Sequence, residues 1–513
     1  MVCRAWRHAN FKRMRRGSRL MAIGLLAPLL PWARNLEEIE KKVNEFTLAN
    51  GMHFIVVERR GAPLVSFHTF VNAGPVDDRA DEPGIARMFE RLAYKGTQQI
   101  GTRNWVEEKK ALDAMERAYD RLEAEKRKGA RASAGHLEAL GAAMRESAAR
   151  ASAYADSNAF PAVFEENAGA DLNAMSSADS TNYFVSLPSH RAELWFLMES
   201  QRLLRPVFRD FYIERSRVIE ERRQSSESGA RGKLLEMLLT TAFAAHPYRN
   251  AAGGWRAGLE SLRPADAESF FQRHFAPGNI TAAIAGDISQ AEAKRLARKY
   301  FSALPPRPAA PPRHVPEVPQ EGAKRVEVAS SGQPWVFAAY KRPDQYHKDD
   351  LVFDILGVVL SSGRSGWLYR DLVAGENVAA MAYAAPSIPG GRFPSLFLVS
   401  VLTANGHSVQ DVERALDVTL DRLKKEKIGP ETLARARTRT RATVIQQLES
   451  NAGIAQALAF YHANYGNWRK LATVLDDIDK VTEDDVRRVA AEYFVPHGRT
   501  VAVNIGPRDG GGQ

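Results

Sequence analysis

Alternating apolar and polar positions divide the chain into a strand-rich start and long helical stretches. Residues 45–59 and 64–73 are rich in Val, Phe, Ile and Thr, and a Gly-Ala-Pro turn separates them, which predicts strands. A helix is expected from about Gly84. Between residues 105 and 154 apolar residues recur every three or four positions, interrupted at 128–135, which predicts a helical hairpin. We interpret it as a surface arm packing on its own domain, with a partner-binding coiled coil as the alternative.

An internal repeat is the next feature of the pattern. Residues 262–287 resemble residues 481–506, because each segment has an amphipathic helix, a Phe-x-Pro break and a β-rich run. A proline-rich polar stretch at 309–322 lies between the two copies and predicts a semi-rigid linker. A duplicated α+β domain is the simplest account. The matched positions are Asp266, Phe275, Pro277 and Thr281 with Asp485, Phe494, Pro496 and Thr500.

The N-terminal stretch has the composition of a targeting segment. Seven basic residues between positions 4 and 19 precede an apolar run at 20–30, which is too short to span a bilayer comfortably. We expect a cleavable export signal at 1–33 and a periplasmic or secreted protein, the alternatives being an uncleaved anchor or a disordered basic start. After its removal, we expect no stable membrane span.

Composition and net charge indicate which classes of protein and partner the chain does not resemble. The chain has 513 residues, 44% hydrophobic and 26% charged, which is typical of a soluble protein with two or more cores. Removing the seven basic residues of the signal from the net charge of +10 leaves +3, so the basic pI does not indicate a nucleic-acid partner. The only cysteine, Cys3, lies in the signal, which suits an oxidising compartment.

The helix at 84–97, GIARMFERLAYKGT, resembles the zinc-motif helix of the pitrilysin and insulinase peptidases, the inverted zincins, which include the short-chain mitochondrial-processing-peptidase-like members. In that family His-x-x-Glu-His lies in a similar Gly-Leu-Ala to Lys-Gly-Thr frame. The match extends from about Asn44 to Gly506, through Asn173-Ala174, FYIERSRVIEERR at 211–223 and the His-Pro-Tyr at 246–248. The resemblance implies two homologous peptidase-like domains, each an antiparallel-rich sheet packed with helices, which enclose a cavity.

These patterns together predict the domain organisation. We predict a first domain at 34–308, with the hairpin at 105–154 inserted in it, the linker, a second domain at 323–506 and a flexible tail at 507–513.

The resemblance also assigns roles at the motif. Two histidines one turn apart hold zinc in the family, and the glutamate between them is the general base. Here both histidine positions are arginine, Arg87 and Arg91, and only the base position keeps Glu90. The third ligand corresponds to Glu221 and a supporting carboxylate to Glu214. The alternative for these two glutamates is that they are ordinary helix-surface carboxylates, since the interval from Arg91 to Glu221 is longer than usual in the family; the inserted hairpin accounts for the excess.

Arginine does not ligate zinc, because a guanidinium has only donors and stays protonated. We therefore expect no metal and no cofactor at this degenerate site, and we infer that the two guanidiniums replace the ion in a cluster with Glu90, Glu214 and Glu221. No two histidines beyond residue 33 stand three or four positions apart, so any other metal site would need histidines distant in the sequence.

Two further regions bear on peptide binding. Family members bind substrate on an exposed sheet edge, and residues 172–187 have the composition of such an edge, so the resemblance assigns substrate binding to Asn173 and Ala174. An internal strand without a ligand is the alternative. In the companion domain, active enzymes place an Arg and a Tyr seven positions apart, where this chain has Val373 and Ala380. The nearby Arg370 and Tyr383 are interpreted as packing or capping residues.

These expectations lead to a functional hypothesis. The resemblance implies a non-catalytic subunit of an exported metallopeptidase complex, which contributes to peptide binding and pairs in a heterodimer with an active homologous subunit. One alternative is an active zinc endopeptidase with non-standard ligands, for which zinc would be the cofactor. The other is a stand-alone peptide-binding or scaffold protein.

Overall fold

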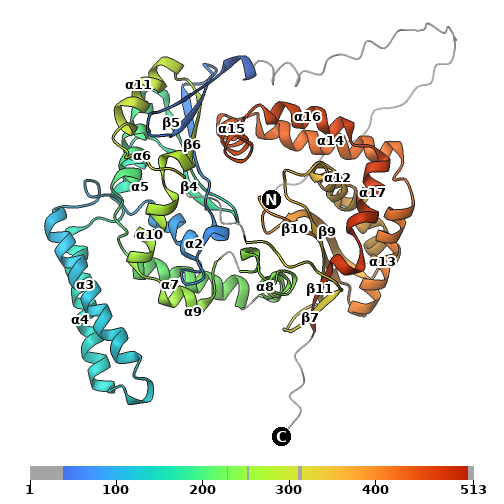
Figure 1. Ribbon diagram of the computed structural model, residues 1–513, viewed down its shortest axis with the longest axis horizontal. Helices are drawn as coiled ribbons and strands as arrows, with labels where there is room; N and C mark the ends of the chain where they lie inside the picture. The colour runs from blue at the N-terminus through green and yellow to red at the C-terminus, as the bar shows by residue number, and fades with distance from the viewer. Residues whose placement is uncertain (1–38, 228, 251–252, 310–314, 506–513) are drawn as a thin grey trace, which may run out of the picture.

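The computed structural model describes residues 39–227, 229–250, 253–309 and 315–505. Two sheets, each covered by helices, occupy the two sides of the molecule in Figure 1, which confirms the predicted α+β fold class. The predicted export signal, the tail at 507–513 and part of the linker lie outside the described residues. Within the described ranges, no helix has the length and apolar character that crossing a membrane requires.

The first sheet has six strands in the order β1-β2-β6-β3-β5-β4. Its neighbours are antiparallel except for β2 and β6, which are parallel. The strand region predicted at 45–59 is in fact two strands, because the chain turns at Gly51, whose φ of 94° favours glycine. The strands are β1 (Val43–Thr47), β2 (His53–Glu58), β3 (Leu64–Val71), β4 (Ala170–Ser176), β5 (Thr181–Pro188) and β6 (Ile280–Gly286).

The second sheet repeats this arrangement without a counterpart of β1. Its order is β7-β11-β8-β10-β9, and β7 and β11 form its one parallel pair among the described strands. The repeat found in the sequence is therefore also a repeat of structure, since β6 and β11 take the same place in the two sheets. The strands are β7 (Lys324–Ala329), β8 (Trp335–Arg342), β9 (Ala379–Ile388), β10 (Ser395–Thr403) and β11 (Arg499–Ile505).

Helices cover both sheets. The helix of the repeat, α10 (Pro264–His274), corresponds to α17 (Glu483–Tyr493), and a short turn that begins with a proline follows each of them. The other helices of the first half are α2 (Ile85–Leu92), α3 (Trp105–Lys126), α4 (Ala134–Tyr154), α5 (Ala159–Glu166), α6 (Ala192–Leu204), α7 (Phe211–Arg222), α8 (Ala230–Ala242), α9 (Arg256–Ser261) and α11 (Gln290–Phe301). Those of the second half are α12 (Asp350–Ser361), α13 (Val409–Lys425), α14 (Pro430–Gln447), α15 (Asn451–Tyr465) and α16 (Lys470–Lys480).

Each half contributes one helix to the sheet of the other half. Helix α15 packs on β3 and β6 of the first sheet, where Ile454 and Leu458 lie in one buried apolar cluster with Phe70. Helix α8 packs on β7 and β11 of the second sheet, where Leu234 and Leu238 share a cluster with Phe337. Because buried apolar area is the main favourable term in association, this exchange holds the two halves together.

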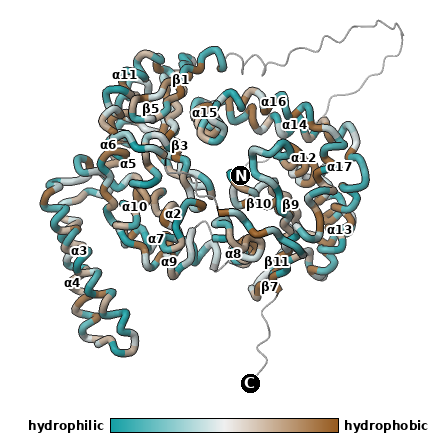
Figure 2. Tube along the Cα trace, in the orientation of Figure 1, coloured by the Kyte–Doolittle hydropathy of each residue, from teal (hydrophilic) through white to brown (hydrophobic). Residues whose placement is uncertain are grey.

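The hairpin of α3 and α4 extends away from the rest of the molecule in Figure 1. Hydrophilic and hydrophobic residues alternate along it in Figure 2, as expected of two helices that pack mainly on each other. Contacts fix its base on the first domain. Arg209 donates to Glu108 at 2.6 Å with both side chains buried, Tyr212 donates to Glu116 at 3.0 Å, and Arg263 donates to Asp120 at 2.8 Å.

Candidate functional site

Helix α2 is held in place by a glycine at its start. Gly84 has φ of 89°, and a Cβ atom there would lie 2.6 Å from Leu259 Cδ2 and 2.8 Å from the Gly253 carbonyl oxygen. A residue with a side chain is therefore excluded by both conformation and space. This close approach fixes α2 against α9, and α2 in turn packs against α7.

Arg87 and Arg91 lie one turn apart on α2 and contact carboxylates of α7. Arg91 forms an ion pair with Glu221 and a longer one, 3.7 Å, with Glu214. Arg87 lies 3.7 Å from Glu221 and also pairs with Glu90. The structure thus brings together all five side chains assigned from the motif. We call Arg87, Glu90, Arg91, Glu214 and Glu221 the arginine–glutamate cluster.

Glu90 stands at the general-base position of the motif. Its carboxylate accepts from the guanidinium of Arg87 and, at 2.7 Å, from the backbone N–H of Ser176 on β4. A general base needs a free lone pair directed at the proton that it removes. In this arrangement the carboxylate of Glu90 serves instead to tie α2 to the edge of the sheet.

Lys95 is a member of the site that the sequence analysis missed. Its ammonium group lies 2.7 Å from Glu214 and 3.3 Å from Asp210. Arg217 adds a third cation to Glu214 at 2.7 Å, and the Glu214 side chain is only 2% exposed. The signal was present in the sequence, because Lys95 follows Arg91 by the same four positions that separate Arg91 from Arg87.

The cluster does not fit a zinc ion. A tetrahedral zinc site needs lone pairs from nitrogen, sulfur or oxygen, and two of the five side chains are guanidiniums that have none to give. They also carry positive charge at the place that a dication would take. The carboxylates are neutralised from within the chain, so the site has the chemistry of an ion-pair network.

The edge strand β4 lies beside α2. The Tyr94 hydroxyl donates to the Asn173 carbonyl at 2.7 Å, and the Asn173 side chain accepts from the Ala174 N–H at 2.8 Å. Asn173 and Ala174 therefore lie on a sheet edge, as the resemblance implied. The prediction that the whole of 172–187 is an edge is wrong, because β5 pairs with β3 on one side and β4 on the other.

A pocket of about 520 Å³ adjoins the arginine–glutamate cluster. Its polar lining comes from Arg87, Glu221 and Ser176 and also from Arg222, Ser225, Ser226, Glu236 and Asn250. The remainder is largely apolar and comes from both halves of the molecule, since Ile388 and Pro389 of the second half also line it.

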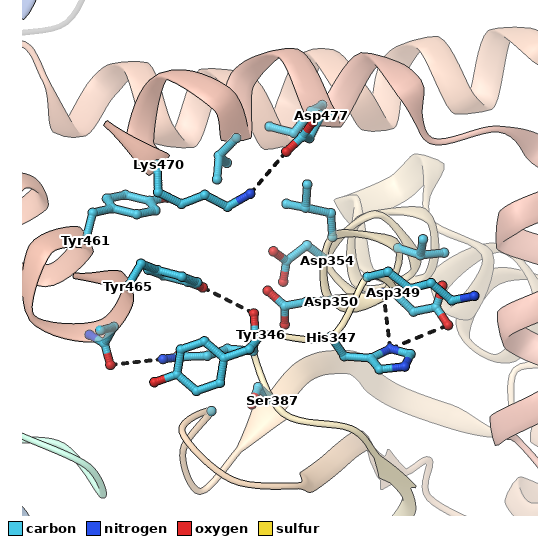
Figure 3. Close-up of a pocket in the computed structure, with 18 of the residues that line it drawn as sticks. Tyr346, His347, Asp349, Asp350, Asp354, Ser387, Tyr461, Tyr465, Lys470 and Asp477 are labelled. Atoms are coloured by element: carbon cyan, nitrogen blue, oxygen red, sulfur yellow. Dashed lines mark hydrogen bonds and ion pairs between the residues drawn. The ribbon is translucent and has the colours of Figure 1, made fainter. Parts of the chain in front are cut away.

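A larger cavity of about 1000 Å³ lies next to α12, and Asp179 and Phe70 of the first half also line it. Figure 3 shows Asp350 and Asp354 pointing into it, opposite Lys470 and Tyr465. Burial, and secondly the neighbouring Asp350, raises the pKa of Asp354 to about 7. This carboxyl group is therefore partly protonated near neutral pH.

Asp179 joins the two halves at the rim of this cavity. Its carboxylate accepts from the Tyr248 hydroxyl at 2.6 Å and from the backbone N–H groups of Gly391 at 2.8 Å and Arg392 at 3.1 Å. Burial and the charge of Asp179 raise the pKa of Tyr248, which keeps the hydroxyl a donor. Asp179 and Tyr248 lie in two segments, 172–187 and 246–248, where the sequence resembles the insulinase peptidases.

Within the described residues, no hydrogen bond or ion pair joins Arg370 or Tyr383 to the arginine–glutamate cluster. The Tyr383 hydroxyl accepts from Arg231 of α8, and the Arg370 guanidinium lies 6.0 Å from the centre of the Trp367 ring. Val373 packs at the edge of the second core, and Ala380 is the second residue of β9, which begins at Ala379. Tyr383 therefore contributes to the contact between the halves.

Comparison with known proteins identifies two family segments. Residues 148–254 match the insulinase (peptidase family M16) model, and residues 261–440 match the peptidase M16 inactive domain. Helix α2 lies outside both ranges. Zinc protease PqqE of Helicobacter pylori is 27% identical over 345 residues, which are 64% of this chain and 74% of that protein. The probable mitochondrial-processing peptidase subunit beta of Schizosaccharomyces pombe is 24% identical over 476 residues, 88% of this chain and 89% of that protein.

Solved structures share the fold. A protease from Helicobacter pylori superposes with a TM-score of 0.75 at 22% identity and covers 90% of this chain and 99% of its own. A peptidase M16 inactive domain from Pseudomonas fluorescens gives 0.71 at 17% identity, covering 91% and 98%. The periplasmic protease PqqL from Escherichia coli gives 0.66 at 16% identity, covering 91% and 48%. From the motif helix, the repeated sheets and these matches together, the chain belongs to the insulinase (M16) peptidase family.

Proposed function

We propose that this protein is an exported, non-catalytic peptidase-like subunit that binds peptides together with a homologous zinc peptidase. The observation that carries the proposal is the arginine–glutamate cluster. Arg87 and Arg91 occupy the positions of the zinc ligands and are neutralised by Glu90, Glu214 and Glu221. With its general-base carboxylate bound to Arg87 and to the Ser176 N–H, the site has neither a metal-bound nucleophile nor a free base.

Peptide binding is supported by the edge strand and the pocket beside it. Strand β4 is paired on one side only, and extended peptides add to such edges through backbone hydrogen bonds. The Ala174 N–H is already engaged by the Asn173 side chain, so an added peptide has to displace that side chain. The pocket of about 520 Å³ next to Arg87 then receives one apolar side chain.

A homologous partner is supported by the names of relatives. The Schizosaccharomyces pombe relative is by name a subunit of a processing peptidase, and the Pseudomonas fluorescens neighbour is described as an inactive M16 domain. Export is supported by the basic and apolar N-terminal pattern and by the periplasmic location in the description of PqqL. A partner that keeps His-x-x-Glu-His supplies the catalytic chemistry in this scheme.

Co-purification from the native envelope fraction, combined with peptidase assays, tests the proposal. We expect the protein to elute with a homologue that contains His-x-x-Glu-His, and peptide cleavage only in the presence of that homologue. Chelator-sensitive cleavage by the isolated protein, or zinc whose amount falls in Glu221→Gln, contradicts the proposal and favours the active enzyme. Elution without a homologue favours a stand-alone binding protein.

A further inference from the structure

Three side chains of types that ligate metal ions lie together where α15 packs on the first sheet, a contact that we call the seam. Glu45 of β1 and His53 of β2 belong to the first half, and His462 of α15 belongs to the second half. One ligand atom from each of the three lies within 4.8 Å of the other two. The two histidines are more than 400 positions apart in the sequence, so only the packing of α15 on the sheet brings them together.

The hydrogen bonds around His53 leave one ring nitrogen available. Its Nδ1 lies 2.9 Å from the Thr47 hydroxyl, and its Nε2 lies 3.4 Å from Glu45 Oε2. Within the described residues this Nε2 is buried, and the long contact with Glu45 is the only polar interaction that it makes. Ligating histidines commonly use one nitrogen for the metal while the other bonds a neighbouring group, and Thr47 has that second role here.

His462 presents a second nitrogen of the same kind. Its Nδ1 is also buried and has no hydrogen-bond partner among the described residues. The rings of His53 and His462 are stacked, with centroids 3.7 Å apart and planes 3° from parallel. The buried Nδ1 of His462 loses its hydrogen bond to water without replacement, and Nε2 of His53 has only the long contact with Glu45, so both nitrogens gain from a bound ion.

Glu45 divides its two oxygens between neighbours. Oε1 lies 3.2 Å from the guanidinium of Arg469, and Oε2 faces His53. The ion pair with Arg469 orients the carboxylate and leaves Oε2 to serve as a ligand. Two imidazoles and one carboxylate form a donor set that suits zinc and its neighbours in the first transition row.

We propose that Glu45, His53 and His462 bind one divalent transition-metal ion of the Zn²⁺ type, with water as the fourth ligand. A metal lies near the plane of each imidazole that ligates it, so one of the stacked rings turns about its Cβ–Cγ bond when the ion binds. The ion cross-links β1 and β2 of the first half to α15 of the second. It therefore fastens the two halves at a place separate from the arginine–glutamate cluster.

Titration of the full-length chain with Zn²⁺ after chelator treatment tests this site. We expect one ion per chain by calorimetry and metal analysis, and a melting temperature that rises with added Zn²⁺. His462→Ala and Glu45→Gln remove both effects, whereas the matched control His190→Ala, an exposed histidine elsewhere on the first half, keeps them. Thr47→Val keeps all three ligands and weakens binding about 10- to 100-fold, because it removes only the group that orients His53.

Two further experiments distinguish zinc at the seam from zinc at the α2 site and from misfolding of the variants. Glu221→Gln leaves seam binding unchanged, so loss of zinc in that variant points to the α2 site instead. Titration with Co²⁺ gives visible absorption bands of a site with nitrogen ligands, which His53→Ala abolishes. The inference is overturned if the folded wild-type chain binds no Zn²⁺, or if Glu45→Gln and Thr47→Val, both folded without metal, bind it as the wild type does.

Discussion

Helices α2 and α12 occupy equivalent places in the two halves, yet they carry opposite charges. Each is the first α-helix after the strand, β3 or β8, that borders the repeat strand in its sheet. Each carries a charged pair four positions apart, Arg87 and Arg91 on α2 and Asp350 and Asp354 on α12, and both helices line cavities. At equivalent positions of the duplicated fold, the first half thus has two cationic residues on α2 and the second half has two acidic residues on α12.

The two halves accommodate these charges by different means. On α2, carboxylates from α7 and from α2 itself pair with the arginines. On α12, Asp350 pairs with Arg342, and Asp354 has no ion pair among the described residues. Burial then favours the protonated form of Asp354. A buried charge is therefore either paired with an opposite charge or neutralised by a proton, according to the groups that the neighbouring elements supply.

Restoring both histidines on α2 is the change with the largest expected effect. Arg87→His with Arg91→His, made in a His462→Ala background to remove the seam site, should create zinc binding with a Kd of about 1 μM or tighter, about −8 kcal/mol. The two imidazoles then meet Glu221 as a third ligand. Metal analysis and calorimetry measure the gain, and adding Glu221→Gln should abolish it. A folded variant that binds no zinc shows that Glu221 is not placed as a ligand.

Removing the buried carboxylate of the cluster should be the next largest effect. Glu214→Gln leaves Arg91, Lys95 and Arg217 without their shared partner, and we expect a loss of about 2 to 4 kcal/mol of unfolding free energy in urea. The matched control is Glu220→Gln on the same helix, where the carboxylate is 49% exposed and pairs with Arg223. That change should leave the unfolding free energy nearly unchanged, because solvent screens an exposed ion pair. Equal losses would show that the cluster does not anchor α7 to α2.

The acid pair on α12 should make the stability of the protein depend on pH. The folded pKa of Asp354, about 7, lies above its unfolded value, so the unfolded chain binds fewer protons between these values. The contribution of Asp354 to stability therefore falls as pH rises from about 4 to about 7, by at most about 1.4 kcal/mol per pH unit. Asp354→Asn should flatten this part of the stability profile, measured by urea unfolding at several pH values. Asp113→Asn, at an exposed ion pair on α3, should leave it unchanged.

The contact of Tyr383 with Arg231 should have the smallest effect. Tyr383→Phe removes one acceptor between β9 and α8, both partly solvated, so we expect a loss of under about 1 kcal/mol. Peptide affinity, measured by fluorescence anisotropy with a labelled peptide, should be unchanged. A large loss of affinity would give Tyr383 a role in holding the peptide and would make the second half a binding element.

Much of the fold followed from local patterns. The offset between Phe275 and Phe494 predicted a duplicated unit, because helix, break and strand signals within some 25 residues are local and repeat when the chain repeats. The edge at Asn173 followed from the resemblance. The extent of that edge did not, because whether β5 is internal depends on β3, which lies more than 100 positions away.

The helices and strands, the duplication and the two arginines at the zinc positions could be predicted without the structure, since they depend on spacing within a helix or strand and on the fixed charge of a guanidinium. Which groups surround these positions depends on the packing of segments that are distant in the sequence. Glu90 meets Ser176 and Lys95 meets Glu214 because α2 packs against β4 and α7, and His462 meets His53 because α15 packs on the first sheet. Burial and partner charge arise from that packing, and they set both the protonation of Asp354 and the availability of a ring nitrogen.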